Sequence, residues 1–399
     1  MKYQFPHITH MDQVLEAIQG RDEFIVKYDR EHGYAVVNYQ VNFEDTFPPV
    51  VDRRTALLRE CRGITFDLKT GQVIARKFHK FHNLNEKVET QPENIDFSQP
   101  HWILEKLDGS MITPMAVNGA IRFNTKMGLT GIALQIDAYA KGKTQLIEFC
   151  KFVLAAGMTP MFEWCSRSQR IVIDHPVDRL VLLAIRENVT GEYMDYDKLV
   201  QLGAQYGVEV VRQVPGTADN IERLMEEVRG LEGEEGWIIR FADGHMLKMK
   251  AEQYLRLHKS LDGLRFEKDV IRMIIGNQLD DIKGLLPPDL VARVDSFAKE
   301  IHSNIKKLAS DLFWTAQASY DNFNGGKKRF ATEVIPQHER KLAGLLFTAW
   351  DYIDSEKTEQ DFIEYVTKMV GDHTSSSGRV DEARYLFGGI SWHEAKDEE

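Results

Sequence analysis

Glu105-Lys106-Leu107-Asp108-Gly109-Ser110 places a lysine two residues before an Asp-Gly turn, and this stretch decides how the chain is interpreted. Lysine is a weak nucleophile in water, because with a pKa of about 10.4 only about one amine in a thousand is uncharged at neutral pH. Burial and neighbouring cations both remove the proton. Alone, Lys-x-Asp-Gly favours a solvated hairpin corner, since these residues are common at turns. Other segments must therefore support covalent catalysis through Lys106.

A strand with two lysines supplies the first support. Leu247-Lys248-Met249-Lys250 alternates apolar and cationic residues, so in a strand both ammonium groups lie on one face. An isolated pair of this kind indicates a half-exposed strand with its lysines in water, but beside Lys106 it could neutralise a triphosphate. Upstream, Gly233-Glu234-Glu235-Gly236-Trp237 places carboxylates just before an apolar strand, which predicts one hairpin with the lysine strand.

A carboxylate lies inside the apolar sequence Met161-Phe162-Glu163-Trp164-Cys165. Burying it is unfavourable unless a cation, a metal or a hydroxyl partners it. Recognition of a ribose hydroxyl or a metal would offset that cost. A salt bridge to Arg170 is the structural alternative, and the sequence leaves both open.

Arg62 and Lys80 precede the nucleophile and are candidate clamps for phosphates. Arg62 leads into a predicted strand, and Lys80 lies in a predicted loop. Arginine offers a planar fork to oxyanions and lysine a mobile point charge, which suits phosphates that must be held and then released. The alternative is ordinary surface charge, with Phe78 and Phe81 in the core.

Composition is compatible with a two-domain protein of the cell interior. The 399 residues are 43% hydrophobic and 28% charged, which is enough for two cores. Three widely spaced cysteines argue for a reducing compartment, and the histidine pairs at 7/10 and 79/82 lack further zinc-ligand spacing. The first residues lack an apolar signal region and no run reaches membrane-spanning length, so we expect a cytoplasmic location without a membrane partner.

The sequence pattern changes near residue 260. Before it, short β-rich runs such as residues 24–28 and 34–39 predict antiparallel hairpins, and helices are expected at 11–19, 131–140, 143–156, 196–206 and 220–229. After it, helices are expected at 266–275, 288 to about 320, 328–352 and 359–370, followed by a loop at 371–379 and a frayed end at 394–399. The prediction is an α+β domain over residues 1–258 and an all-helical domain over 259–399.

Taken together, the motifs resemble those of bacteriophage ATP-dependent RNA ligases of the RNA ligase 1 class, within the superfamily of lysine-adenylating enzymes. The resemblance covers roughly residues 30 to 258 and rests on these motifs in order: E-C-R-G-I, K-F-H-N-L-N-E, K-L-D-G-S, F-N-T-K, F-E-W, R-I-V, I-R-E-N-V-T-G-E-Y, E-E-G-W and K-M-K. It implies an ATP-grasp-like nucleotidyltransferase domain of antiparallel sheets and helices. The helical domain that follows would then serve RNA or tRNA specificity.

The resemblance also implies a role for each matching residue. Lys106 would become linked to AMP, with Lys248 and Lys250 at the α-phosphate. The nucleotide-binding residues would be Arg62, Lys80, Lys126, Glu163 and Tyr254. Glu235 and Glu163 would bind a divalent metal, Mg²⁺ or Mn²⁺. Two departures are Leu107, where an acidic residue can occur, and Glu234, a second acid before Glu235; Gly236 and Trp237 favour Glu235 as the metal residue.

The implied reaction has three steps: Lys106 takes AMP from ATP, AMP moves to an RNA 5′-phosphate, and an RNA 3′-hydroxyl displaces it. The implied partners are a tRNA with a broken anticodon loop and an end-healing kinase or phosphatase, for a monomer in the infected host cytoplasm. The net charge of −11 does not exclude RNA, because a few clustered cations set the local field.

Two other kinds of protein are alternatives. A DNA ligase or a GTP-using capping enzyme is disfavoured, because those families append an oligonucleotide-binding β-barrel where this chain turns helical. A non-catalytic RNA-binding protein on a ligase fold is disfavoured because every charged catalytic position is filled. The basic runs Arg53-Arg54 and Lys327-Lys328-Arg329 are interpreted as ordinary surface patches.

Overall fold

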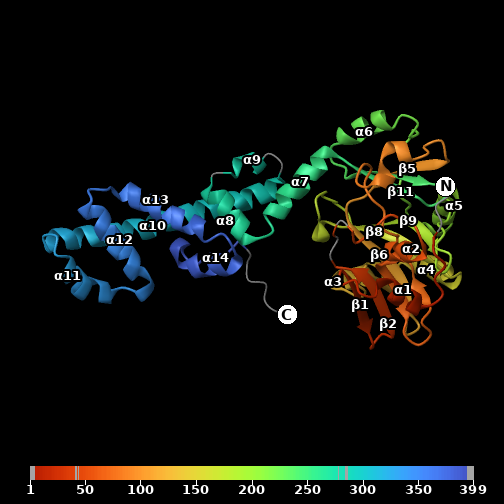
Figure 1. Ribbon diagram of the computed structural model, residues 1–399, viewed down its shortest axis with the longest axis horizontal. Helices are drawn as coiled ribbons and strands as arrows, with labels where there is room; N and C mark the ends of the chain where they lie inside the picture. Colours follow the sequence, from red (N-terminus) through yellow and green to blue (C-terminus); the bar gives the residue numbers. More distant parts are fainter. Residues whose placement is uncertain (1–4, 41–42, 44, 277, 284–285, 393–399) are drawn as a thin grey trace. The chain divides into compact units, whose positions relative to one another are not determined.

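The computed structural model describes residues 5–40, 43, 45–276, 278–283 and 286–392, which form two compact units (Figure 1). The first unit is Met1–Leu255 and the second is Arg256–Glu399. Every strand of the described chain belongs to the first unit, and the second is helical. The division falls within α7 (Glu252–Gly263), and the boundary expected after residue 258 lies in the same helix.

The first unit contains three antiparallel sheets, which confirms the predicted α+β class. One sheet has the order β1-β2-β3-β4, with bounds Phe24–Asp29, Tyr34–Tyr39, Arg62–Asp67 and Val73–Ala75. The second has the order β11-β10-β5, with bounds Met246–Lys250, Gly236–Phe241 and His101–Lys106. The third has the order β7-β6-β8-β9, with bounds Ala120–Asn124, Ser110–Val117, Met158–Cys165 and Arg179–Glu187.

Helices of the first unit begin and end close to where their sequence patterns predict. The expected helices are α1 (Met11–Ile18), α3 (Gly131–Ala140), α4 (Thr144–Ala155), α5 (Tyr196–Tyr206) and α6 (Ile221–Arg229). A further helix, α2 (Arg53–Glu60), has no counterpart in the sequence analysis. Asp52 caps it, since its carboxylate accepts a hydrogen bond from Thr55 N at 2.7 Å. The helix ends at Glu60, two residues before Arg62, where β3 begins.

The strand with two lysines has the two faces that its alternation predicts. Leu247 and Met249 are buried in an apolar cluster, whereas Lys248 and Lys250 remain partly exposed. β11 pairs with β10 so that Lys250 lies opposite Gly236. Gly236 has a φ of 143°, and a Cβ there would lie 2.0 Å from Met249 O, so glycine is required for this close pairing.

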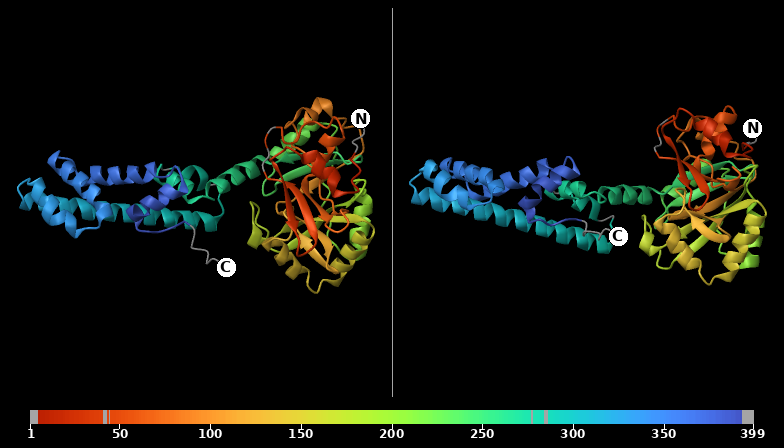
Figure 2. Two further views of the ribbon diagram at one scale, coloured as in Figure 1. Left: turned by 60° about the horizontal axis from the view of Figure 1, so that its bottom comes forward. Right: turned by 90° about the horizontal axis from the view of Figure 1, so that it is seen from below.

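The second unit is built around the long helix α10 (Pro288–Asn322), which packs against α12 (Ala343–Asp354) and α13 (Glu359–Asp372), as Figure 2 shows from two sides. Phe313, Trp350 and Phe362 belong to its apolar core. The other helices are α8 (Glu267–Ile275), α9 (Asp280–Lys283), α11 (Lys327–Arg329) and α14 (Ser377–Ala383).

Two predictions for this unit are wrong. The single helix expected at 328–352 is broken into α11, a π-helical turn at Phe330–Val334, 3-10 turns at Ile335–Gln337 and Arg340–Leu342, and α12. Pro336 explains the break, because proline has no N–H group and disfavours helical backbone at the residue before it. The loop expected at 371–379 is also interrupted, because Ser376 caps α14 by accepting a hydrogen bond from Arg379 N at 3.3 Å. The frayed end expected at 394–399 lies outside the described residues.

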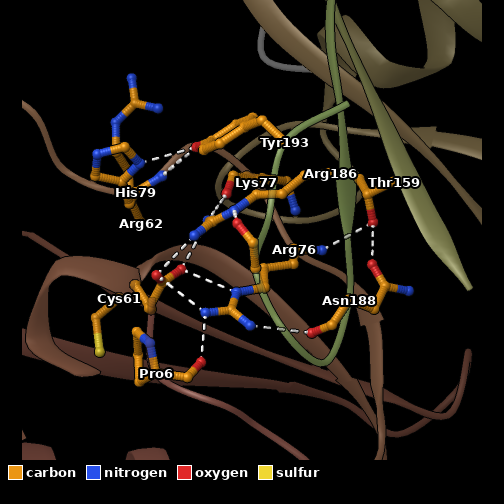
Figure 3. Close-up of polar contacts among 12 residues, drawn as sticks. Pro6, Cys61, Arg62, Arg76, Lys77, His79, Thr159, Arg186, Asn188 and Tyr193 are labelled. Carbon is orange, nitrogen blue, oxygen red and sulfur yellow. Dashed lines mark hydrogen bonds and ion pairs between the residues drawn. The ribbon is translucent and has the colours of Figure 1, made fainter. Parts of the chain in front are cut away.

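A buried ionic network joins α2 to the sheet that contains β8 and β9 (Figure 3). The carboxylate of Glu60 accepts two hydrogen bonds from Arg186, each 2.7 Å long, and one of 3.1 Å from Arg76 Nε. Burial acts to raise the pKa of Glu60, but the two guanidinium groups outweigh it and lower that pKa to about 2. Arg76 also donates to the carbonyls of Pro6 and Val189. The network fixes the backbone two residues before Arg62.

The three cysteines and the histidines of the 79/82 pair are all buried in the protein interior. Cys61, Cys150 and Cys165 are free and buried, and burial raises the pKa of the Cys150 and Cys165 thiols to about 12. His79 bonds to the Tyr193 hydroxyl, and His82 to Glu86. Within the described ranges no three His, Cys, Asp or Glu side chains are grouped to hold a metal, and no helix is both long and apolar enough to cross a membrane.

Candidate active site

A cavity of about 190 Å³ opens where β5 ends, and it gathers most of the predicted site residues. Lys106, the last residue of β5, lines it together with both lysines of β11. The predicted residues that line it are Arg62, Lys80, Lys106, Glu163, Lys248 and Lys250. They come from all three sheets and from the loop after β4, so the fold unites segments that lie far apart in the sequence.

Lys106 and Lys250 share one carboxylate. Lys106 Nζ lies 2.6 Å from Glu235 Oε1, and Lys250 Nζ lies 3.0 Å from the same oxygen. The strand register explains this arrangement, because Gly236 of the central strand β10 lies opposite Lys106 of β5 on one side and Lys250 of β11 on the other. Glu235, only 5% exposed, precedes that glycine. Glu235 was expected at the site as a metal residue, and its ion pairs with the two lysines were not predicted.

The Asp-Gly turn after Lys106 is not a solvated corner. Asp108 is 3% exposed, and its Oδ2 accepts hydrogen bonds of 2.7 Å from the backbone N–H groups of Val172 and Ile173. A Cβ on Gly109 would lie 2.4 Å from the carbonyl oxygen of Trp164, so glycine lets the turn pack directly on β8. This contact brings the loop after Lys106 beside Glu163.

Tyr254 does not line the cavity, although the resemblance places it at the phosphates. The side chain is 3% exposed, and its hydroxyl donates to Asp108 Oδ1 at 2.9 Å. Lys250 Nζ lies 5.0 Å from the centre of its ring. In this structure the Tyr254 side chain therefore contacts both the Asp-Gly turn and Lys250.

Glu163 is a buried acid with an unusual proton affinity. Burial raises its pKa to about 8, the Glu235 and Asp108 carboxylates add to this rise, and Lys106 and Arg62 only partly oppose it. The alternative partner, Arg170, donates instead to the carbonyl of Val172 at 3.0 Å. Glu163 and Glu235 offer the oxygen ligands that Mg²⁺ and Mn²⁺ prefer, so these residues fit a hard divalent cation.

Glu163→Gln is expected to remove one falling component from the pH dependence of stability measured without divalent cations. Because the pKa of about 8 in the fold exceeds the ordinary 4.5, the stability from Glu163 is complete below pH 4.5 and is lost as the pH rises through 8. The free energy of unfolding of the natural protein minus that of the variant should fall across this window by up to about 1.4 kcal/mol per pH unit, because the other titrating groups are common to both proteins. Urea unfolding between pH 5 and 8 measures both slopes, and equal slopes would contradict the prediction.

Tyr39 is a site residue that the sequence analysis missed. Its ring lines the cavity, and the Lys80 and Lys126 ammonium groups lie 5.1 Å and 5.2 Å from the ring centre. Burial acts to raise the pKa of Tyr39, but Lys80, Arg62 and Lys126 outweigh it and lower that pKa. The residue ends a predicted hairpin strand, and nothing in its local sequence marks it.

Lys126 lies beside this group without lining the cavity. Its backbone packs on Gly63, where a Cβ would lie 2.7 Å from Lys126 Cα and where φ is 85°. The F-N-T-K and E-C-R-G motifs are thus in direct contact. Burial and the Lys80 and Arg62 charges lower the pKa of Lys248 to about 7. The cavity lining has five basic side chains against the two acids Glu105 and Glu163, which suits a polyanion.

Comparisons with known proteins agree on one family. The family model for RNA ligase matches residues 60–255. The chain is 30% identical over 339 residues to a protein of Thermovibrio ammonificans named "Putative RNA ligase", covering 83% of this chain and 84% of that protein. It is 25% identical over 284 residues to RNA ligase 1 of bacteriophage TS2126, covering 69% of each. Among solved structures it is similar to an archaeal ATP-dependent RNA ligase, with a TM-score of 0.46 and 15% identity over 63% of this chain and 64% of that one.

Proposed function

Because the chain belongs to the RNA ligase family, we propose that it uses ATP to join an RNA 5′-phosphate to an RNA 3′-hydroxyl through a covalent Lys106–AMP intermediate. One observation carries the proposal. Lys106 lies at the wall of a cavity lined by Arg62, Lys80, Lys248 and Lys250, with Glu235 as its ion-pair partner. A lone lysine nucleophile beside a cluster of cations is the arrangement that nucleotidyl transfer requires.

Each step of the proposed reaction exchanges one bond to phosphorus. Lys106 Nζ gives up its ammonium proton to water and attacks the α-phosphorus of ATP, and pyrophosphate leaves with the electron pair. An RNA 5′-phosphate oxygen then attacks the same phosphorus and releases the lysine, which takes up a proton from water. Last, an RNA 3′-hydroxyl loses its proton to water, attacks the 5′-phosphorus and expels AMP.

The side chains of the cavity stabilise charge in these steps. Lys248 and Lys250 stand on β11, which the central strand β10 separates from Lys106 on β5, and they would stabilise the α-phosphate oxygens as the leaving group departs. Arg62 and Lys80 line the same cavity and would hold the β- and γ-phosphates. An anion bound there also favours the charged form of Lys248, whose pKa of about 7 leaves it poised between its two forms.

Glu163 and Glu235 would hold a divalent metal, Mg²⁺ or Mn²⁺, which would neutralise charge on the phosphates. A nearby cation would favour ionised Glu163 and so reverse the effect of burial on its pKa. Tyr254, through its bond to Asp108, keeps the turn after the nucleophile in place.

Incubation with α-labelled ATP and Mg²⁺ tests the proposed intermediate. The label should remain on the protein, and the bond should break in acid and survive alkali, as a phosphoramidate does. Gel electrophoresis followed by acid or alkali treatment measures this. Absence of label on folded protein that binds ATP would reject the mechanism.

We propose that the helical unit, Arg256–Glu399, recognises tRNA broken in the anticodon loop, that an end-healing kinase or phosphatase first prepares the RNA ends, and that the ligase is a monomer. Truncation after about residue 260 should reduce sealing of nicked tRNA at least tenfold while self-adenylation stays within threefold. The physical reason is that the described residues lining the nucleotide cavity all belong to the first unit. Equal losses in both assays would remove the division of labour.

A further inference from the structure

A second cavity, of about 300 Å³, adjoins the proposed nucleotide site and shares Lys80 and Phe81 with it. Its size is at the lower end of the range of small-molecule pockets, about 300–1,000 Å³. It lies within the first unit, between the loop that follows β4 and the β10–β11 turn. None of the roles proposed so far uses it.

Two of the side chains that line it each carry a buried polar atom without a hydrogen-bond partner among the described residues. The two atoms are Arg59 Nε and His82 Nε2, and the two side chains that carry them are 4% and 1% exposed. Buried polar groups are nearly always hydrogen-bonded, so each of these two side chains has a polar atom with hydrogen-bonding capacity left for a ligand in the cavity.

The two atoms need different hydrogen-bond partners. Arg59 Nε carries a hydrogen and can only donate. His82 Nδ1 lies 2.8 Å from Glu86 Oε1, and a carboxylate can only accept, so Nδ1 carries the proton. Burial lowers the pKa of His82 to about 4, which leaves the ring neutral and Nε2 an acceptor. A complementary ligand therefore presents both an acceptor and a donor.

The charge of the lining disfavours an anion or a metal ion. Its cations are Arg59 and Lys80, and its carboxylates are Glu89, Asp96 and Asp243. Arg59 is already paired with Glu89 at 2.7 Å. A phosphate would meet an excess of carboxylates, and a metal ion would meet a buried guanidinium.

Aromatic rings line the same cavity. Phe81 and His79 have ring centres 5.7 Å apart, and Phe241 and His245 are stacked at 5.5 Å. A flat, neutral ligand with a donor and an acceptor on one edge matches this lining. Single-stranded RNA is recognised in this way, by aromatic stacking and by hydrogen bonds to base edges.

We propose that this cavity binds one nucleobase of the RNA strand whose end enters the nucleotide site. The proposal rests on the proposed function, because Lys80 and Phe81 would then stand between the bound base and the phosphates being transferred. The base comes from either the 5′-phosphate strand or the 3′-hydroxyl strand.

Val50 and Val51 give a matched pair of variants. Val50 lines the cavity and is 36% exposed, so Val50→Trp should fill its mouth without disturbing the core. Val51 is 80% exposed and does not line it, so Val51→Trp is the control. Neither residue belongs to the nucleotide site.

The measurement is RNA binding by fluorescence anisotropy, with single abasic nucleotides placed in turn along each strand. In the natural protein and in Val51→Trp, removing the base at one position should weaken binding about tenfold. In Val50→Trp the same removal should cost less than twofold, because the pocket no longer contributes. The sensitive strand identifies the source of the base. A base effect that survives Val50→Trp, or none at any position, would overturn the proposal.

A second pair tests the histidine. His82→Asn keeps an amide where Nδ1 donates to Glu86 and removes the acceptor, whereas His82→Gln puts a polar atom near the position of Nε2. His82→Asn should lose the drop in affinity caused by removing the base, and His82→Gln should keep part of that drop. A larger drop in His82→Asn than in His82→Gln would contradict the role of Nε2 as the acceptor.

Self-adenylation separates this proposal from the proposed function. Val50→Trp should adenylate within twofold of the natural protein, because ATP does not enter the second cavity. If the natural protein shows the base effect without adenylation, the ligase mechanism fails and the base pocket stands. If it adenylates and seals RNA without a base effect, the pocket proposal fails alone.

Discussion

Lys106→Ala is expected to lower self-adenylation by a factor on the order of 10⁴ or more, since it removes the group that forms the covalent bond. The same variant should still seal RNA that already carries a 5′-adenylate, because the last step uses the 3′-hydroxyl and the cationic cavity and needs no lysine nucleophile. Two assays measure this: transfer of labelled AMP to the protein, and ligation of pre-adenylated RNA without ATP.

Lys151→Ala is a matched control, since Lys151 is an exposed lysine on α4. It should adenylate as the natural protein does. Normal adenylation by Lys106→Ala would show that another residue is the nucleophile. Loss of both activities would instead mean that Lys106 holds the cavity together through its ion pair with Glu235.

Glu60→Gln is expected to destabilise the first unit by about 3–5 kcal/mol, the usual cost of removing one partner from a buried ion pair. Arg76 and Arg186 are both fully buried, and the variant leaves their charges without a carboxylate. Because the pKa of Glu60 is lowered to about 2, its contribution is complete above the ordinary pKa of 4.5 and is lost as the pH falls toward 2. The difference between variant and natural protein should therefore shrink in acid.

Urea unfolding at pH 7 and at pH 3 measures this difference. Glu16→Gln serves as the control, because Glu16 is exposed on α1 and should change stability by less than about 0.5 kcal/mol. A loss below about 1 kcal/mol for Glu60→Gln at pH 7 would show that the network contributes little. Self-adenylation, measured at urea concentrations below the unfolding transition, would then report whether the change at Glu60 disturbs the site that contains Arg62.

Local pattern was sufficient for the parts of the fold that depend on periodicity. The alternation in Leu247-Lys248-Met249-Lys250 predicted the two faces of β11, and the carboxylates before Trp237 predicted its hairpin with β10. Apolar spacing located most helices of both units. Lys106, Lys248 and Lys250 were placed in one site through the family resemblance, and the strand register shows why they meet.

What sequence could not supply depends on contacts between distant segments. Glu60, Arg76 and Arg186 look like ordinary surface charges, and only the fold places them together in the interior. Tyr39 belongs to the site because β2 passes beside Lys80 and Lys126, which no local pattern records. The ion pair between Lys106 and Glu235 was not predicted, because the resemblance assigned Glu235 to a metal and only the strand register brings its carboxylate to the lysine. The break at Pro336 was overlooked because the apolar spacing continues across it.

The three native cysteines are inaccessible to thiol reagents, since all are buried and burial raises the pKa of each thiol. A cysteine engineered at an exposed position would thus be the fast-reacting thiol, and fluorophores could be attached without first removing the natural ones. A donor dye on the first unit and an acceptor dye on the second would report, by energy transfer, how the separation of the units responds to ATP and to RNA.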